Sequence, residues 1–217
     1  MLGVIQARLG STRLPGKVLM EIKGKPLLRY VTERVAMACD QVLVLCPAKD
    51  FREIWKACSS ADVEIKGIPG DENDVYERFL RGLPYHCRFA RICADSPLID
   101  PAVIKYVAIQ LYEKMLNGGN CWPKTWPSGQ CVEVMDTAEY REPLESELTA
   151  EDREHAGMPF FWRTGGLQNV ANPLGDFSAV NMCVDTREDF DRISDVIGRM
   201  TRPHVEYGWH EIMELMA

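Results

Sequence analysis

Hydrophobic positions along the chain fall into short continuous runs that alternate with longer amphipathic segments. Three largely apolar runs predict buried strands at 2–5, 41–46 and 89–93, and a further short strand is predicted at about 62–66. Apolar residues at helical spacing predict four helices, at about 27–39, 49–58, 75–81 and 101–115. Because strands and helices alternate, the pattern predicts a layered α/β fold with a mostly parallel central sheet.

The pattern is least regular between residues 118 and 163, where glycine and Trp-Pro pairs interrupt it. Residues 132–135 alternate like a half-exposed strand, and 137–147 and 150–155 are helical in pattern. The apolar run 159–162 suits either a strand or a subunit contact. We therefore expect one domain over residues 1–217 with a less regular excursion at about 118–163.

The C-terminal part of the chain predicts one more strand and two helices. An apolar strand over 179–184 ends at Asp185, and an amphipathic helix runs from Thr186 to about Met200. Residues 208–216 form a short final helix. No apolar run reaches membrane-spanning length, and strand-like sequence begins at once in place of a signal peptide. We therefore expect a cytoplasmic protein with no membrane partner.

Composition and charge narrow the class of ligand. The chain carries a formal net charge of -7, and its pI near 5.2 argues against a nucleic-acid partner. An acidic exterior with one cationic pocket suits a small anionic ligand better. The eight cysteines contain no C-x-x-C pair, so we interpret them as mostly reduced, buried small hydrophobes.

The loop after the first strand reverses the sign of the charge locally. It carries three cations and no acidic residue: Arg8, Arg13 and Lys17. Backbone N–H groups freed by Gly10 and Gly16, with fixed cations around them, suit a triphosphate. The loop is not a Walker motif, because five residues separate its glycines and valine follows the lysine. No G-x-G-x-x-G occurs either, so a classical dinucleotide fold is not supported.

The pattern Gln-Ala-Arg-x-x-Ser-x-Arg-Leu-Pro-x-Lys at 6–17 resembles the opening of a known enzyme family. These are the cytidylyltransferases that activate acidic sugars, of the acylneuraminate and 3-deoxy-manno-octulosonate types. The subgroup named after spore coat polysaccharide biosynthesis protein F is the most similar. The resemblance implies a three-layer nucleotidyltransferase fold that is glycosyltransferase-A-like and Rossmann-like. It also implies that the loop binds the nucleotide through Gln6, Ala7, Arg8, Gly10, Ser11, Arg13 and Lys17. A solvated basic turn is the alternative.

A second segment, Gly-Asp-Glu-Asn-Asp-Val at 70–75, is similar to one found in the same subgroup. There it lies near the base and ribose of the nucleotide, so the resemblance implies a polar nucleotide contact from Asn73. The alternative is local, since Asn73 or Asp74 would serve well as the N-cap of the helix that follows.

Two aspartates follow predicted strands. A carboxylate at the carboxyl end of a buried strand lies at the crevice where α/β sheets bind ligands. The segment 94–99 is similar to the family's Gly-Asp-x-Pro-Leu-Ile, and 184–189 to its Val-Asp-Thr-x-Glu-Asp. The resemblance implies that Asp95 and Asp185 hold a magnesium ion, and Asp95 would also contact the nucleotide. For Asp185 the alternative is a helix N-cap.

The prediction of residues that contact the sugar acceptor rests on the resemblance alone. Arg-Glu-His at 153–155 matches a family motif whose histidine lies toward the sugar, so His155 is a candidate contact together with Gln130 and Glu133. The subgroup has Gly-Leu-Asp before its Val-Glu-Val, where this chain has Gly-Gln-Cys at 129–131. An acidic group expected near the sugar is therefore missing. Three tryptophans either line the acceptor pocket or fill an interface: Trp122, Trp126 and Trp162.

The implied reaction is transfer of CMP from CTP to an acidic, sialic-acid-like or related sugar, with release of pyrophosphate, in surface polysaccharide or glycan synthesis. Lys17, Arg13 and Arg8 would neutralise the leaving pyrophosphate, and Mg²⁺ on Asp95 and Asp185 would orient the α-phosphate. CTP and an acidic sugar are the expected partners, and relatives suggest a homodimer that the excursion would mediate.

Two other functions remain open on the sequence. A glycosyltransferase of the same sheet architecture would need a D-x-D at a strand end, but the D-x-D at 189–191 lies early in a predicted helix. A catalytically silent nucleotide-binding relative is the third possibility, which the departure at 129–131 keeps open.

Overall fold

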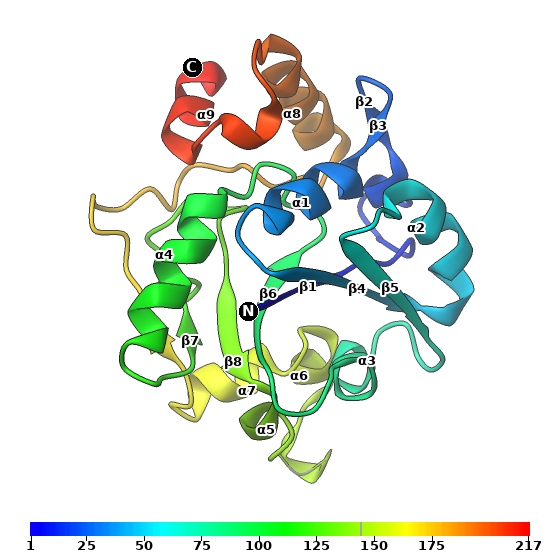
Figure 1. The fold of residues 1–217 in the computed structure, drawn as a ribbon, viewed down its shortest axis with the longest axis vertical. Coiled ribbons are helices and arrows are strands. Elements are labelled where there is room, and N and C mark those ends of the chain that lie inside the picture. The colour runs from blue at the N-terminus through cyan, green and yellow to red at the C-terminus, as the bar shows by residue number, and fades with distance from the viewer. Residues whose placement is uncertain (144) are drawn as a thin grey trace.

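The computed structural model describes residues 1–143 and 145–217, which are built around a seven-stranded sheet of order β5-β4-β1-β6-β8-β7-β9 (Figure 1). Four neighbouring strands run parallel: β5 (Val63–Ile68), β4 (Gln41–Pro47), β1 (Leu2–Gln6) and β6 (Arg88–Cys93). The other three continue the sheet, and β8 is antiparallel to both neighbours: β8 (Glu133–Asp136), β7 (Gly118–Gly119) and β9 (Gln168–Asn169). The predicted mixed α/β fold with a mostly parallel sheet is confirmed.

Side chains that alternate along the strands feed two separate cores, one on each face of the sheet. Ile5 and Val44 enter the first core, while Val4 and Leu43 enter the second. Helices on the first face are α1 (Leu27–Ala36), α2 (Phe51–Cys58), α4 (Pro101–Tyr112), α8 (Arg187–Arg199) and α9 (Trp209–Met216). Helices on the second face are α3 (Val75–Gly82), α5 (Thr137–Tyr140), α6 (Ala150–Glu154) and α7 (Met158–Arg163). Figure 1 shows these two helical layers on opposite sides of the strands.

The remaining regular elements are short. A two-stranded hairpin and four 3₁₀ turns connect the larger ones: β2 (Glu21–Ile22), β3 (Lys25–Pro26), η1 (Lys17–Leu19), η2 (Ala48–Asp50), η3 (Glu145–Glu147) and η4 (His204–Glu206). In the described part of the chain, no helix combines the length and the apolar character that crossing a bilayer requires.

A buried arginine fastens α1 to the segments around it. The side chain of Arg34 is fully buried, and its guanidinium donates to the backbone carbonyls of Ile99, His204 and Tyr207. Burial lowers the pKa of Arg34 to about 10, which leaves it charged at neutral pH. One side chain therefore satisfies three buried acceptors and joins α1 to the turn before α4 and to the C-terminal segment.

Three predicted elements differ in the structure. The run 159–162, for which a strand was one prediction, lies in helix α7, which begins after Gly157 in the left-handed conformation. The segment 179–184 is not a strand, because its backbone bonds to loops and forms only an isolated bridge between Ser128 and Asn181. The helix predicted over 137–147 ends at Tyr140, since Pro143 cannot continue it; Leu144 lies outside the described residues. All eight cysteines are free as expected, but only Cys46 and Cys58 are buried.

Candidate active site

The basic loop after β1 is held by a hydrogen bond to the Asp50 side chain of η2 and by a backbone bond within the loop. The Leu9 N–H donates to the carboxylate of Asp50 at 2.9 Å, and the Gly16 N–H donates to the Leu9 carbonyl at 3.0 Å. Gly16 has a φ of 69°, a left-handed conformation that favours glycine, and it turns the chain so that Lys17 begins η1. The sequence did not single out Asp50, whose buried carboxylate anchors this loop.

Lys17 lies at the centre of the site, where three chain segments meet. Its ammonium donates to Asp95 Oδ2 at 2.9 Å, to Asp185 Oδ1 at 3.0 Å and to the Val184 carbonyl at 2.7 Å. The segments are also joined directly, because the Val184 N–H donates to the Asp95 carbonyl. Burial alone would lower the pKa of Lys17, but attraction to Asp95 and hydrogen bonds to both aspartates raise it overall. Lys17 is therefore a fixed positive charge.

A cavity of about 240 Å³ opens over this cluster at the carboxyl ends of the parallel strands. Arg13 pairs with Asp185 at 3.0 Å at its rim. The structure thus brings together residues far apart in sequence, and most of the predicted nucleotide and metal residues line one cavity: Gln6, Arg8, Ser11, Arg13, Lys17, Asp95 and Asp185. With Arg91 and Glu154, four cations and three carboxylates line this cavity, a charge pattern that suits a phosphate ester with its counter-ion.

Arg8 connects the basic loop to two other segments. Its guanidinium donates to Asn73 Oδ1 at 2.7 Å and to Glu154 at 3.0 Å. Asn73 is exposed and contacts the site through Arg8, while its neighbour Asp74 caps α3, as the local interpretation predicted. The sequence did not single out Glu154, which places α6 beside the basic loop.

Besides Asn73, two predicted nucleotide residues lie outside the residues that line the cavity. Ala7 is buried, and its N–H is used by the Leu45 carbonyl. Gly10 is exposed beside Glu72, where a Cβ would come within 2.9 Å of a carboxylate oxygen. Ala7 can therefore reach a ligand only through its backbone carbonyl, and Gly10 keeps the loop close to Glu72.

The carboxylate oxygens of Asp95 and Asp185 suit a hard cation whose remaining ligands would come from the substrate. Asp95 and Asp185 offer carboxylate oxygens to one point, which the Lys17 ammonium occupies. Among the described residues no group of three or more His, Cys, Asp or Glu side chains could form a complete metal cage. Magnesium prefers such sites, with one or two carboxylates, water and substrate phosphates as ligands.

A second cavity, of about 660 Å³, adjoins the first and shares Arg91, Cys93 and His155 with it. The predicted acceptor residues His155 and Glu133 line it, together with Trp122 and Trp162. Trp126 does not, because it is buried and donates its indole N–H to the Val170 carbonyl.

The prediction that Gln130 binds the acceptor is wrong. Its side chain is fully buried, where it accepts from the Asp100 N–H and donates to the Leu98 carbonyl at 2.8 Å each. Gln130 therefore holds the turn before α4 and is not accessible to a ligand.

A buried ion pair between the two cavities was also missed in the sequence. Arg91 of β6 donates to Glu133 of β8 at 2.5 Å, and the other Glu133 oxygen accepts from the Trp162 indole at 2.9 Å. The pair forms because Arg91 and Glu133 face each other across antiparallel strands. A charged residue in the middle of the apolar run 89–93 was the signal in the sequence. The network fixes Trp162 in the wall of the second cavity.

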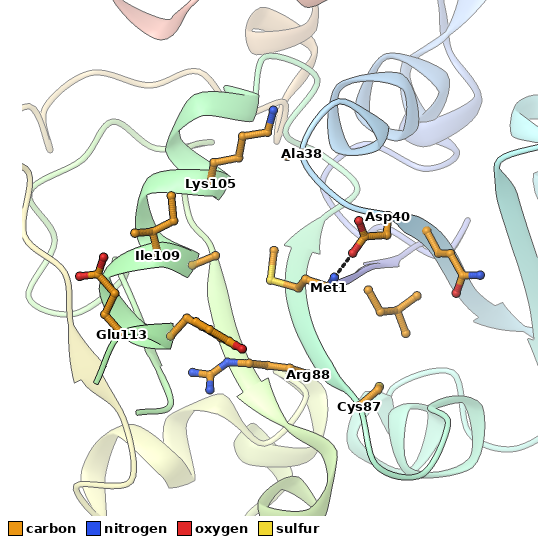
Figure 2. A pocket seen from close by; sticks show the side chains of 12 residues that line it. Met1, Ala38, Asp40, Cys87, Arg88, Lys105, Ile109 and Glu113 are labelled. Carbon is orange, nitrogen blue, oxygen red and sulfur yellow. Dashed lines mark hydrogen bonds and ion pairs between the residues drawn. The ribbon is translucent and has the colours of Figure 1, made fainter. Parts of the chain in front are cut away.

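A larger, mostly apolar cavity of about 740 Å³ lies at the opposite end of the sheet. Figure 2 shows it between α4 and the start of β1, with Lys105 and Ile109 on one side and the ion pair between the Met1 amino group and Asp40 on the other. Ligands of α/β sheets bind at the carboxyl ends of the strands, so this cavity is not the candidate active site.

The D-x-D at 189–191 has a structural role. Asp189 forms the capping box of α8 with Thr186, and Asp191 pairs with Arg187 on the same helix. Neither aspartate is among the residues that line the two cavities at the carboxyl ends of the strands.

A sequence model of the cytidylyltransferase family matches residues 2–196, which include every residue of the site. The chain belongs to the cytidylyltransferase family. Among curated family members, the 3-deoxy-manno-octulosonate cytidylyltransferases of Yersinia pseudotuberculosis and Yersinia pestis are 36% identical over 117 residues. This match spans 51% of the chain and 45% of each relative, so the chain aligns with about half the length of those enzymes.

Solved structures support the same fold. A cytidylyltransferase from Leptospira borgpetersenii superposes with a TM-score of 0.82 at 24% identity, covering 99% of this chain and 92% of that one. CMP:2-keto-3-deoxy-manno-octonic acid synthetase, solved with CTP, superposes with a TM-score of 0.64 at 17% identity, covering 91% and 98%. At these identities the likeness shows the nucleotidyltransferase fold.

Proposed function

We propose that this chain is a cytidylyltransferase that transfers CMP from CTP to an acidic sugar and releases pyrophosphate. One observation carries the proposal: the Lys17 ammonium bonds both Asp95 and Asp185 inside a cavity that Arg8 and Arg13 also line. Family membership supports CTP as the donor, and the names of the curated relatives support a sugar acid as the acceptor.

The residues of this cavity would act by position and charge. A sugar hydroxyl attacks the α-phosphorus of CTP, the bond to the β-phosphate oxygen breaks, and pyrophosphate leaves in line. Such transfers ask the protein for alignment and charge neutralisation more than for covalent chemistry. Arg8, Arg13 and Lys17 neutralise the negative charge that builds on the leaving pyrophosphate.

Asp95 and Asp185 would hold a magnesium ion together with oxygens of the triphosphate. When bound, this ion supplies Lewis-acid polarisation of the α-phosphate and lowers the pKa of a coordinated hydroxyl. In the structure the Lys17 ammonium pairs with both carboxylates and so balances their charge. Beside a bound cation, the same ammonium would face the phosphates.

The 660 Å³ cavity would bind the sugar, and we call it the acceptor cavity. It adjoins the 240 Å³ cavity, which we call the phosphate pocket. His155 lines both cavities, so a group bound there is next to the attacked phosphate. Trp162 offers an aromatic wall whose orientation the Arg91–Glu133 pair fixes, which suits the apolar face of a sugar ring. His155 is exposed and is the residue we assign to the acid group of the acceptor.

Pyrophosphate release from CTP, measured with Mg²⁺ and a panel of sugar acids, tests this function. We expect release with one class of acid and not with its neutral analogue, and the Lys17→Met variant should be far slower. ATP and UTP in place of CTP test the base. Turnover of a UDP-sugar without pyrophosphate release would instead support a glycosyltransferase. CTP binding without turnover of any acceptor would support a silent nucleotide-binding protein.

A further inference from the structure

Two cysteines, Cys121 and Cys131, line the 660 Å³ acceptor cavity. Strands β7 and β8 are antiparallel, with Gly119 opposite Glu133. Just beyond the paired strands, the Asn120 N–H donates to the Val132 carbonyl at 3.1 Å, and the Asn120 side chain accepts from the Val132 N–H at 2.7 Å. The next residues outward are both cysteines: Cys121 begins the turn after β7, and Cys131 lies in the loop before β8.

The contact between Asn120 and Val132 holds the segments that carry the two cysteines side by side. A disulfide joins residues whose Cα atoms lie about 4.4–6.8 Å apart, a separation that residues adjoining such a backbone contact can reach. Cys121 and Cys131 are free, and the Cys121 thiol lies against Asn120 Oδ1 at 3.8 Å and the Val132 carbonyl at 3.9 Å. The two thiols also interact with each other, which raises the pKa of Cys121 and lowers that of Cys131.

Both thiols are also accessible from the cavity. Cys121 and Cys131 are half-buried, and they line the 660 Å³ cavity with Trp122, which directly follows Cys121. We propose that Cys121 and Cys131 are a modification site, a dithiol between the turn after β7 and the loop before β8 that a peroxide oxidises reversibly to a disulfide in the wall of this cavity.

The chemistry starts from Cys131. The interaction with the Cys121 thiol lowers the pKa of Cys131, and the positive charges of Lys124 and Arg91 act in the same direction. The Cys131 thiolate attacks one peroxide oxygen, the O–O bond breaks, and a sulfenic acid forms. The hydroxide that leaves takes up the proton that the Cys131 thiol lost and becomes one water. The Cys121 sulfur then attacks the sulfenic sulfur, the S–O bond breaks, and the hydroxide leaves as a second water with the thiol proton. Each sulfur loses one electron, and the peroxide is reduced to two waters.

Oxidation would change the acceptor cavity and leave the phosphate pocket alone. A disulfide brings the sulfurs to about 2 Å, which draws the segment with Trp122 toward β8 and removes both thiol donors from the cavity wall. Neither cysteine is among the residues lining the 240 Å³ cavity. The effect on acceptor use rests on the proposed function, whereas formation of the disulfide does not.

The test treats the full chain with hydrogen peroxide and maps cysteines by mass spectrometry without reduction. Trypsin separates the two cysteines after Lys124, so the expected product is a cross-link between peptides 115–124 and 125–141, reversed by dithiothreitol. The oxidised protein should also melt about 5 °C higher, since the bridge closes a short loop. Cys121→Ser and Cys131→Ser should each lose both effects. Cys87→Ser, a half-buried cysteine in the cavity of Figure 2, should keep them.

Two results would overturn the proposal: sulfinic or sulfonic acid at Cys131 with no cross-link, or a cross-link to any other cysteine. Thermal stabilisation by CTP separates this proposal from the proposed function. Reduced and oxidised protein should respond equally to CTP. If neither responds and the cross-link still forms, the nucleotide function fails and the modification site stands.

Discussion

Replacing Lys17 with methionine should strengthen the binding of a divalent cation in the phosphate pocket and weaken the binding of CTP. The substitution keeps the length of the side chain but removes the ammonium that bonds Asp95 and Asp185. A divalent cation competes with this ammonium for the same oxygens, so the empty pocket of the variant should bind Mn²⁺ more tightly. The triphosphate loses a cation that faces it, so CTP should bind more weakly.

The size of both effects follows from the contacts. Hydrogen bonds to charged groups contribute about 1.5–3 kcal/mol each. The side chains of Asp95 and Asp185 are 28% and 32% exposed, so solvent screening places each effect near the lower end of that range. About 1.5 kcal/mol corresponds to roughly tenfold in affinity. We therefore expect Mn²⁺ to bind about tenfold more tightly without nucleotide, and CTP about tenfold more weakly.

Titration calorimetry of the nucleotide-free protein with Mn²⁺, and then with CTP at saturating Mn²⁺, measures both quantities. Lys23→Met is the matched control, because Lys23 is an exposed lysine that bonds only the Gly198 carbonyl among the described contacts. Weaker Mn²⁺ binding by Lys17→Met would refute the competition between ammonium and cation. Unchanged CTP affinity would show that Lys17 does not face the triphosphate.

Three further substitutions test other parts of the structure. Asp185→Asn should lower kcat about a hundredfold while the far-ultraviolet circular dichroism stays unchanged; equal turnover would remove Asp185 from the reaction. Hydrogen bonds from Arg163 lower the pKa of Asp152 to about 2, below its unfolded value of 3.8, so this stabilisation is present above pH 4 and lost toward pH 2. Urea unfolding should therefore show Asp152→Asn less stable than wild type at pH 6, with the gap closing by pH 2; a constant gap would contradict this. Arg34→Met should cost about 3 kcal/mol in urea unfolding, because three buried carbonyls lose their donor; a loss below 1 kcal/mol would mean that water replaces it.

The sequence predicted the parts of the fold that local pattern determines. The run 41–46 is apolar throughout, and it is β4 over Gln41–Pro47. The four apolar residues at 159–162 are too few to show a period, so the helix that contains them could not be told from a strand. Residues 179–184 have strand-like composition, but their backbone partners are loops, and partners are set by tertiary structure.

For the candidate site, too, the sequence predicted some residues correctly and missed or misplaced others. Lys17 and Asp95 were singled out because a basic loop and a carboxylate at a strand end keep their chemistry in any α/β fold, and because their motifs resemble a family. Asp185 was singled out at the end of a predicted strand that the structure does not form, so only its motif placed it correctly beside Lys17. Gln130 was misplaced, since the sequence does not show which way a polar side chain points. Arg91 was missed because its partner faces it only after β8 inserts beside β6 in antiparallel register.

The two bonds of Arg8 imply a preferred order of substrate addition. In the structure Glu154 holds Arg8, and Glu154 directly precedes His155, which lines both cavities. Under the proposed function, a triphosphate that recruits Arg8 would release Glu154 and leave the turn carrying His155 free to adjust to the second substrate. Initial-rate kinetics should therefore show a sequential mechanism in which CTP enters first, and Glu154→Gln should weaken that order without removing the site for either substrate.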